Sequence, residues 1–197
     1  RLEALRGNTD EAAKLYERAG DTRGAASVYM TMADYEMAAL VFKEGGLRAE
    51  AADAFAAAGR FDTAVGLFEE LGQWDRALEA ASQMGDIERQ AGILARMGKD
   101  DASGRLLAES AEKQGNWDEA AARWEEAGEP KRAAEAWREA GQLARAGKLL
   151  VKMGDLQAAA SLLVKSGDFN LAAEVFVRLG RFTEAGHAYH RAGDLGR

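Results

Sequence analysis

Glycine recurs at every thirteenth position along much of the chain, and apolar residues keep fixed places after each glycine. With the glycine counted as the first place, apolar residues fall at the third, sixth, tenth and thirteenth places. That spacing puts them along one face of an α-helix. A fixed period of this kind is typical of repeat proteins, in which each unit is one small structural element. The pattern therefore predicts one short helix for every repeat unit.

The repeated glycine position accounts for fourteen of the 22 glycines in the chain. Ala33 fills the one gap in the first series, and a longer step separates Gly98 from Gly115, after which the regular spacing resumes. The glycines at this position are Gly7, Gly20, Gly46, Gly59, Gly72, Gly85, Gly98, Gly115, Gly128, Gly141, Gly154, Gly167, Gly180 and Gly193.

The residues around each glycine predict where one helix ends and the next begins. Glycine readily adopts the left-handed conformation that ends a helix. The following residue is Asp or Asn in eight units, and such side chains accept hydrogen bonds from the free N–H groups at a helix start. Pro130 falls at a first helical position, where its missing N–H is harmless. The predicted N-cap residues are Asn8, Asp21, Asp34, Asp86, Asn116, Asp155, Asp168 and Asp194.

The sixth and tenth places pair a small residue with a large one. The sixth place is alanine in twelve units, with Gln90 and Ser103 as exceptions, and the tenth is usually aromatic. Alanine leaves a hollow that a ring can enter, so that helix axes approach to ~8–10 Å. We therefore expect Ala172 to be buried, and Trp124 and Trp137, which hold the tenth place, to belong to the core.

A helix of about 10 residues is ~15 Å long and too short to be stable alone in water. Turns of two or three residues force successive helices to run antiparallel. The sequence therefore predicts an all-α protein, an α-solenoid of about fourteen short antiparallel helices. We expect about seven 26-residue hairpins in a right-handed superhelix, one array over residues 1–197 cut from a longer chain.

The segment GDFNLAAEVFVRLGRFTEAGHAYHRAGD resembles tetratricopeptide repeats, whose helices also begin with a Gly-polar-aromatic turn and carry a small residue at the packing position. The resemblance covers nearly the entire chain. It departs from the family in its doubled period of 26 instead of 34, and in having only one proline. The short units are also similar to the solenoids of vesicle-coat and intraflagellar-transport proteins. The resemblance implies a scaffold that binds protein or peptide partners and has no catalytic residues or cofactors.

One unit is irregular. Residues 98–114 contain four extra residues, 111–114, which add about one helical turn. We expect a longer helix here. The extra turn is either a tolerated surface insertion or a ledge that marks a binding region.

The amino-acid composition and motifs exclude several classes of catalytic and binding site. The chain has no cysteine, which excludes disulfides, thiolate zinc sites and cysteine nucleophiles. Two segments that end at Lys99 and Lys148 approach a phosphate-binding loop, but their glycine spacing is wrong and no Ser or Thr follows. With only two histidines and no nucleophile elbow, the sequence predicts no enzyme activity and no cofactor.

The two histidines, His187 and His190, follow Glu184 at helical spacing and could place three metal ligands on one face. No matching partner motif occurs elsewhere in the sequence. We therefore interpret this face as solvated and predict no metal site.

The charge is uneven, with a net −7 overall, −6 over residues 1–98 and +2 over residues 148–197. An acidic chain argues against binding a phosphate backbone, and no stretch approaches the ~18 apolar residues of a membrane span. We expect no nucleic-acid or membrane partner. We also expect the protein to be cytoplasmic and to come from a bacterium. The alternatives are a repeat module for a small ligand or nucleic acid, or a spacer that self-associates end to end.

Three polar residues are candidate partner-binding positions. Arg123 holds the ninth place, where other units carry Leu, Val, Ile or Ala, and a charge buried there without a partner is costly. It either pairs with Glu119 or Glu126, or its helix faces a groove. Gln90, which replaces a packing alanine, and Arg105 are the other two candidates.

Overall fold

The computed structural model describes the backbone of residues 2–193, and the side chains of residues 8, 9 and 11–193. In this part of the chain the only regular elements are α-helices, which are joined by turns. The chain divides into two compact units, Arg1–Met97 and Gly98–Arg197. The boundary coincides with the start of the irregular repeat. A single array over residues 1–197 stays a prediction.

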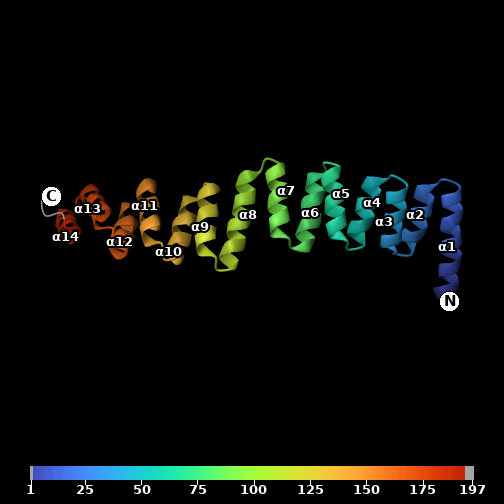
Figure 1. Cartoon of the computed structure of the whole chain (residues 1–197), viewed down its shortest axis with the longest axis horizontal. Helices are drawn as coiled ribbons and strands as arrows, with labels where there is room; N and C mark the ends of the chain where they lie inside the picture. Colours follow the sequence, from blue (N-terminus) through green and yellow to red (C-terminus); the bar gives the residue numbers. More distant parts are fainter. Residues whose placement is uncertain (1, 194–197) are drawn as a thin grey trace. The chain divides into compact units, whose positions relative to one another are not determined.

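Each helix packs against its neighbours in sequence within its own unit (Figure 1). Because the connecting turns are short, neighbouring helices are antiparallel and form hairpins. Unit 1 contains α1 (Leu2–Arg18), α2 (Thr22–Thr31), α3 (Tyr35–Glu44), α4 (Arg48–Ala57), α5 (Phe61–Glu70), α6 (Trp74–Met84) and α7 (Ile87–Arg96). Unit 2 contains α8 (Asp100–Lys113), α9 (Trp117–Glu126), α10 (Pro130–Glu139), α11 (Leu143–Met153), α12 (Leu156–Ser166), α13 (Phe169–Arg178) and α14 (Phe182–Arg191). The described residues thus confirm fourteen helices, most of them 10 or 11 residues long.

The repeated glycines lie in the turns with positive φ, as predicted, from Gly20 at 73° to Gly193 at 78°. The exception is Gly7, because α1 runs unbroken through Gly7 and Asn8. A glycine inside a helix costs only about 1 kcal/mol relative to alanine, so it does not by itself end one. The prediction of a turn at this position was wrong. Ala33 is the only described non-glycine residue with positive φ, at 57°.

Five of the predicted N-caps are confirmed. Their side-chain oxygens accept a hydrogen bond from the backbone N–H three residues later: Asp21, Asp34, Asp86, Asp155 and Asp168. Asn116 also holds the N-cap position of α9, as predicted, but its side chain makes no cap bond; its Nδ2 donates instead to Oε1 of Gln114, at 3.4 Å. Gln114 belongs to the four extra residues and supplies this competing partner. Asp194 lies outside the described residues.

The core consists largely of alanine. The sixth-place alanines from Ala25 to Ala185 are buried, and so are most residues at the seventh place, which the sequence analysis did not single out. Adjacent positions on a helix point about 100° apart, so two neighbouring small residues serve two neighbouring helices. This second stripe allows a helix inside the stack to pack on both sides. Its buried members are Ala13, Ala26, Ala39, Ala52, Val65, Ala91, Ala121, Ala134, Gly147, Ala160 and Ala173.

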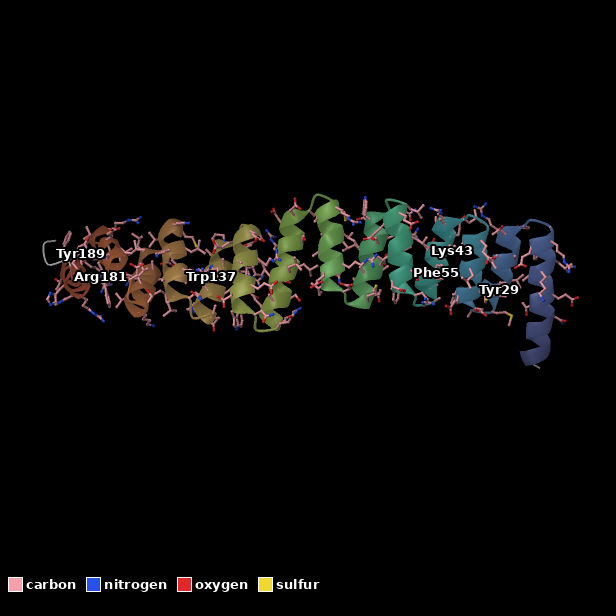
Figure 2. All side chains as sticks on the ribbon, viewed as in Figure 1. Tyr29, Lys43, Phe55, Trp137, Arg181 and Tyr189 are labelled. Atoms are coloured by element: carbon pink, nitrogen blue, oxygen red, sulfur yellow. The ribbon has the colours of Figure 1, made fainter. Side chains whose placement is uncertain are left out.

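The large tenth-place residues fill the space between these stripes. Phe55 of α4 is 4% exposed and Trp137 of α10 is 6% exposed, and both lie inside the stacks of their units (Figure 2). Tyr16 of α1 differs, with 43% of its surface exposed. Among the described helices α1 packs extensively against α2 alone, so one side of its apolar face is uncovered.

Many of the salt bridges join helices that are two apart in sequence. In unit 1, Arg23 of α2 pairs with Glu50 of α4 at 2.7 Å. In unit 2, Lys148 of α11 pairs at 3.2 Å with Asp168, the N-cap of α13. Alternate helices are therefore neighbours in one layer. Exposed pairs of this kind each contribute about 0–1 kcal/mol, so packing dominates the stability.

The irregular unit forms a longer helix, as predicted: α8 has 14 residues. Its extra turn carries Glu112, whose carboxylate accepts a hydrogen bond from Nε1 of the fully buried Trp124, at 2.7 Å, and from Nη2 of Arg132, at 2.8 Å. The Arg132 guanidinium carbon lies 3.6 Å from the centre of the Trp124 ring. These three residues, called here the tryptophan clasp, connect α8, α9 and α10.

Two of these contacts, the Trp–Glu hydrogen bond and the Arg–Trp stacking, recur in the next repeat unit, across α9, α10 and α11. Nε1 of Trp137 donates to Glu125 at 2.5 Å, and the Arg145 guanidinium carbon lies 4.7 Å from the centre of the Trp137 ring. Glu112 thus occupies the position that Glu125 holds in a regular unit. The end of α8 is in register with the units that follow, and the extra turn anchors the helices beyond it.

Candidate functional site: a groove between α10 and α12

A groove lies in unit 2, between α10 and α12, with α11 beneath it. Its volume is about 780 Å³. The residues that line it are Lys131, Ala134, Glu135, Arg138, Leu150, Met153, Gly154, Asp155, Ala158, Ser161, Leu162 and Lys165. The α10 and α12 residues of this set are three or four apart along each helix, so each helix presents one face to the groove.

The groove has an apolar floor and a charged rim. Ala134 is buried, and Leu150, Met153, Ala158 and Leu162 are half-buried. The charged side chains and Ser161 are exposed. A concave site with an apolar floor and a few polar groups around it is the usual form of a ligand-binding surface in proteins.

Local packing keeps the floor in place. A side chain added at Gly147 of α11 would put its Cβ 2.8 Å from Cγ of Leu163 on α12, so the absence of a side chain lets the two helices approach closely. Leu163 is completely buried. At the start of α12, Oδ1 of Asp155 accepts a hydrogen bond from the N–H of Ala158, at 3.1 Å. This cap fixes the end of the groove where α12 begins.

The charged residues of the rim differ between the two ends of the groove. Since α10 and α12 are both antiparallel to α11, they run parallel, and their C-terminal ends lie at the same end of the groove. Arg138 and Lys165 stand at that end, which we call the cationic end. Lys131 and Asp155 stand at the opposite end. Glu135 lies on the α10 side of the rim, between Lys131 and Arg138.

Several rim charges have no partner in the part of the chain that the structure describes. Among the described residues, Lys131, Glu135 and Lys165 form no salt bridge or side-chain hydrogen bond, whereas most arginines in both units are paired. Arg138 pairs only with Glu139, at 3.1 Å, and both side chains are about half exposed. An exposed pair of this kind is weak and readily exchanged. The rim therefore offers charges to a ligand at little cost.

None of the three predicted partner-binding residues lines this groove. Gln90, in unit 1, is half-buried and donates from Nε2 to the carbonyl oxygens of Asp86, at 3.2 Å, and Ala81, at 3.4 Å. Those bonds explain how an amide is accommodated at a place normally held by alanine. Gln90 nevertheless stays a predicted contact.

The two predicted arginines in unit 2 are paired. Arg105 forms a salt bridge with Glu129 at 2.8 Å, and Arg123 forms one with Glu126 at 3.2 Å. The second pair is one of the two alternatives weighed from the sequence. With 40% of its side chain exposed, Arg123 avoids the cost of burial. A role of either arginine in partner binding also stays a prediction.

The histidine-containing face of α14 is organised by a salt bridge. Glu184 accepts hydrogen bonds from Nε and Nη2 of Arg181, at 2.9 and 2.7 Å. The Arg181 hydrogen bonds, together with a backbone hydrogen bond and the charges of Arg181 and His187, lower the pKa of Glu184 below its ordinary value despite some desolvation. Within the described residues no group of three or more acidic or histidine side chains could hold a metal ion.

No helix in the part of the chain that the structure describes combines the length and apolar character needed to cross a membrane.

No protein-family model and no curated protein matches the sequence. Solved structures do resemble it, and tetratricopeptide repeat proteins are among them. A structure of Naa15/Naa10 bound to HypK-THB is 14% identical with a TM-score of 0.41; the match covers 96% of this chain and 36% of that one. A tetratricopeptide repeat protein from Parabacteroides merdae ATCC 43184 is 13% identical with a TM-score of 0.32, covering 98% of this chain and 94% of that one. BtubC (BKLC) from P. vanneervenii is 16% identical with a TM-score of 0.23, covering 99% and 84%.

The chain spans 36% of the length of the first of these proteins. Because the identities and TM-scores are low, the fold class rests on the helices, turns and packing of the chain itself. Those features define an all-α, tetratricopeptide-like α-solenoid, as the sequence predicted.

Proposed function

We propose that the protein is a non-enzymatic interaction scaffold that binds a segment of a partner protein in the groove between α10 and α12. The observation that carries this proposal is the combination of an apolar floor with three rim charges, Lys131, Glu135 and Lys165, that have no partner among the described residues. A partner segment covers the floor and pairs with the rim, which are the two contributions that an exposed groove of this kind can make to binding.

A protein segment suits the groove better than the alternatives from the sequence. A phosphate backbone would meet Glu135 and Asp155 as well as the three cations, and like charges on the rim oppose it. A small ligand would need convergent polar groups, yet the half-buried and buried lining is apolar. The cytoplasmic location and the bacterial origin both stay predictions.

Site-specific photocrosslinking tests the proposal. A photoreactive phenylalanine analogue at Ser161, which is exposed in the groove, is expected to crosslink a discrete partner segment in cells, identified by mass spectrometry. The matched control is the same analogue at Ala122, which is exposed on α9 outside the groove. Identical adducts from both positions, or none from Ser161, would show that the groove does not bind a protein partner.

A further inference from the structure

The groove is short, and this limits what it can hold. Lys131 and Arg138 mark the two ends of its α10 wall, seven helical steps apart. At ~1.5 Å per residue this distance is about 10 Å, the length of three or four residues of an extended chain at ~3.3 Å each. The groove therefore fits a short linear segment and is too small for the surface of a folded domain.

The two ends of the groove differ in charge. At the cationic end, Lys165 has no partner among the described residues, and Arg138 has only an exposed one. At the other end Asp155 lies close to the start of α12, where it caps the helix, and Lys131 stands on the opposite wall. A carboxylate on a ligand is consequently favoured at the cationic end, whereas Glu135 on the α10 wall and Asp155 at the other end oppose one elsewhere in the groove.

The middle of the groove selects for apolar side chains. Leu150 and Met153 of α11 and Leu162 of α12 form the floor, and all three are half-buried with part of their surface exposed to water. Covering this surface is favourable because apolar area leaves water. Methionine adapts its shape to different apolar groups, so the floor accepts more than one kind of side chain.

We propose that the segment bound in this groove is a short extended peptide with one or two apolar side chains on the floor and an Asp or Glu side chain at the cationic end. This inference rests on the proposed function, and it adds the chemistry and the direction of the bound segment. Arg138 and Lys165 attract the acidic side chain of the peptide, and the floor packs against its apolar side chains.

The test uses the full chain and a random dodecapeptide library displayed on phage. The unaltered protein is expected to select peptides with an acidic residue flanking an apolar one. The combined variant Arg138→Glu/Lys165→Glu is expected to select Lys or Arg at that position instead. A matched control is Lys152→Glu, because Lys152 is exposed on α11 and does not line the groove. This control should leave the selection unchanged.

Affinities of a selected peptide, measured by fluorescence anisotropy, quantify the effect. We expect about tenfold weaker binding to the combined variant and a near-normal affinity for the Lys152→Glu control. The neutral variant Arg138→Gln/Lys165→Gln should fall between them, and circular dichroism checks that all variants are folded. Raising the salt concentration should weaken binding to the unaltered chain, because exposed charge pairs are screened.

The outcomes separate the two proposals. Selection of peptides without an acidic bias, or a bias that the combined variant retains, would overturn the acidic-segment inference and leave the groove as a peptide site. Peptides that still bind after Ser161→Trp fills the groove, or no selected peptide at all, would overturn both. Binding of fluorescent oligothymidylate that is lost in the combined variant would assign the groove to nucleic acid and also overturn both.

Discussion

At the scale of single residues, the backbone conformation of the turns determines where the helices end. Thirteen described glycines have φ between 68° and 85°, and Ala33 alone adopts this region with a side chain, at 57°. The left-handed conformation costs a residue with a Cβ roughly 1–2 kcal/mol, a cost that glycine avoids. The glycine period could be read from the sequence because this cost is local and does not depend on packing.

Ala33→Gly should therefore raise the free energy of unfolding by about 1 kcal/mol, because glycine relieves the strain at this turn. The measurement is the urea midpoint of unfolding. Ala95→Gly is the control, because Ala95 is exposed on α7 in a helical conformation, and there the same change should lower stability or leave it nearly unchanged. Equal losses for both variants would show that the conformation at Ala33 is not strained.

At Gly147 glycine has a different role: a side chain is excluded by the lack of space beside Leu163, and the backbone angle is not the reason. Gly147→Ala should destabilise the protein, because the new Cβ would meet Cγ and Cδ2 of Leu163 at 2.8 and 2.9 Å. Gly186→Ala on α14 is the matched control, since nothing lies within 4 Å of a Cβ there. That control should gain up to about 1 kcal/mol from helix propensity. Thermal unfolding of the two variants would move in opposite directions, and a gain for both would refute the close approach.

At the scale of the helices, packing depends on two stripes of small residues, of which the sequence analysis found one. The sixth-place alanines were recognised because they pair with the aromatic tenth place. The seventh-place stripe was missed because a single helical face was considered, although a stacked helix has neighbours on two sides. Ala172 is completely buried, as predicted.

Ala172→Leu should cost roughly 1–3 kcal/mol of stability, because three extra carbon atoms have no space in this contact. Ala122→Leu, on the exposed face of α9, should change stability by less than about 0.5 kcal/mol. Differential scanning calorimetry of the pair distinguishes packing from a general effect of leucine. An unchanged melting temperature for Ala172→Leu would refute this packing face.

The tryptophan clasp was not predicted, although a signal for it exists in the sequence. Glu lies twelve residues before each of Trp124 and Trp137, and Arg lies eight residues after each. A contact across three helices becomes visible only when the repeat register is followed through the irregular unit. The clasp shows that the extra turn of α8 has a structural role.

Glu112→Ala should cost about 1–3 kcal/mol, because it leaves Nε1 of the buried Trp124 without an acceptor. Glu109→Ala is the control, since Glu109 contributes only an exposed salt bridge to Arg132, worth less than about 1 kcal/mol. Adding Trp124→Phe should remove most of the difference, because phenylalanine has no N–H to satisfy. Chemical denaturation of the single and double variants measures this coupling, and equal costs for the two glutamates would contradict the clasp.

At the scale of the whole molecule, the fold was predictable and the candidate site was not. The glycine period is repeated often enough to predict the class, the number of helices and the longer α8. The groove could not be predicted in the same way, because it is formed by side chains of α10, α11 and α12 that come together only in the folded structure. Its residues are ordinary members of their repeats, so Arg123 and Gln90 attracted attention as exceptions to the pattern while Lys165 did not.

The central structural claim is that each repeat unit from Gly20 onward forms one short helix with its own start and end. Hydrogen exchange of single backbone amides, measured by NMR, tests it most directly. The first N–H groups of a helix have no partner within the helix, so rapid exchange should recur at the first three residues of each helix whose N-cap side chain makes no cap bond, as at residues 61–63 and 182–184. The amides between these positions should be protected. Protection that runs unbroken through residues 61–63, or rapid exchange with a different period, would contradict the account.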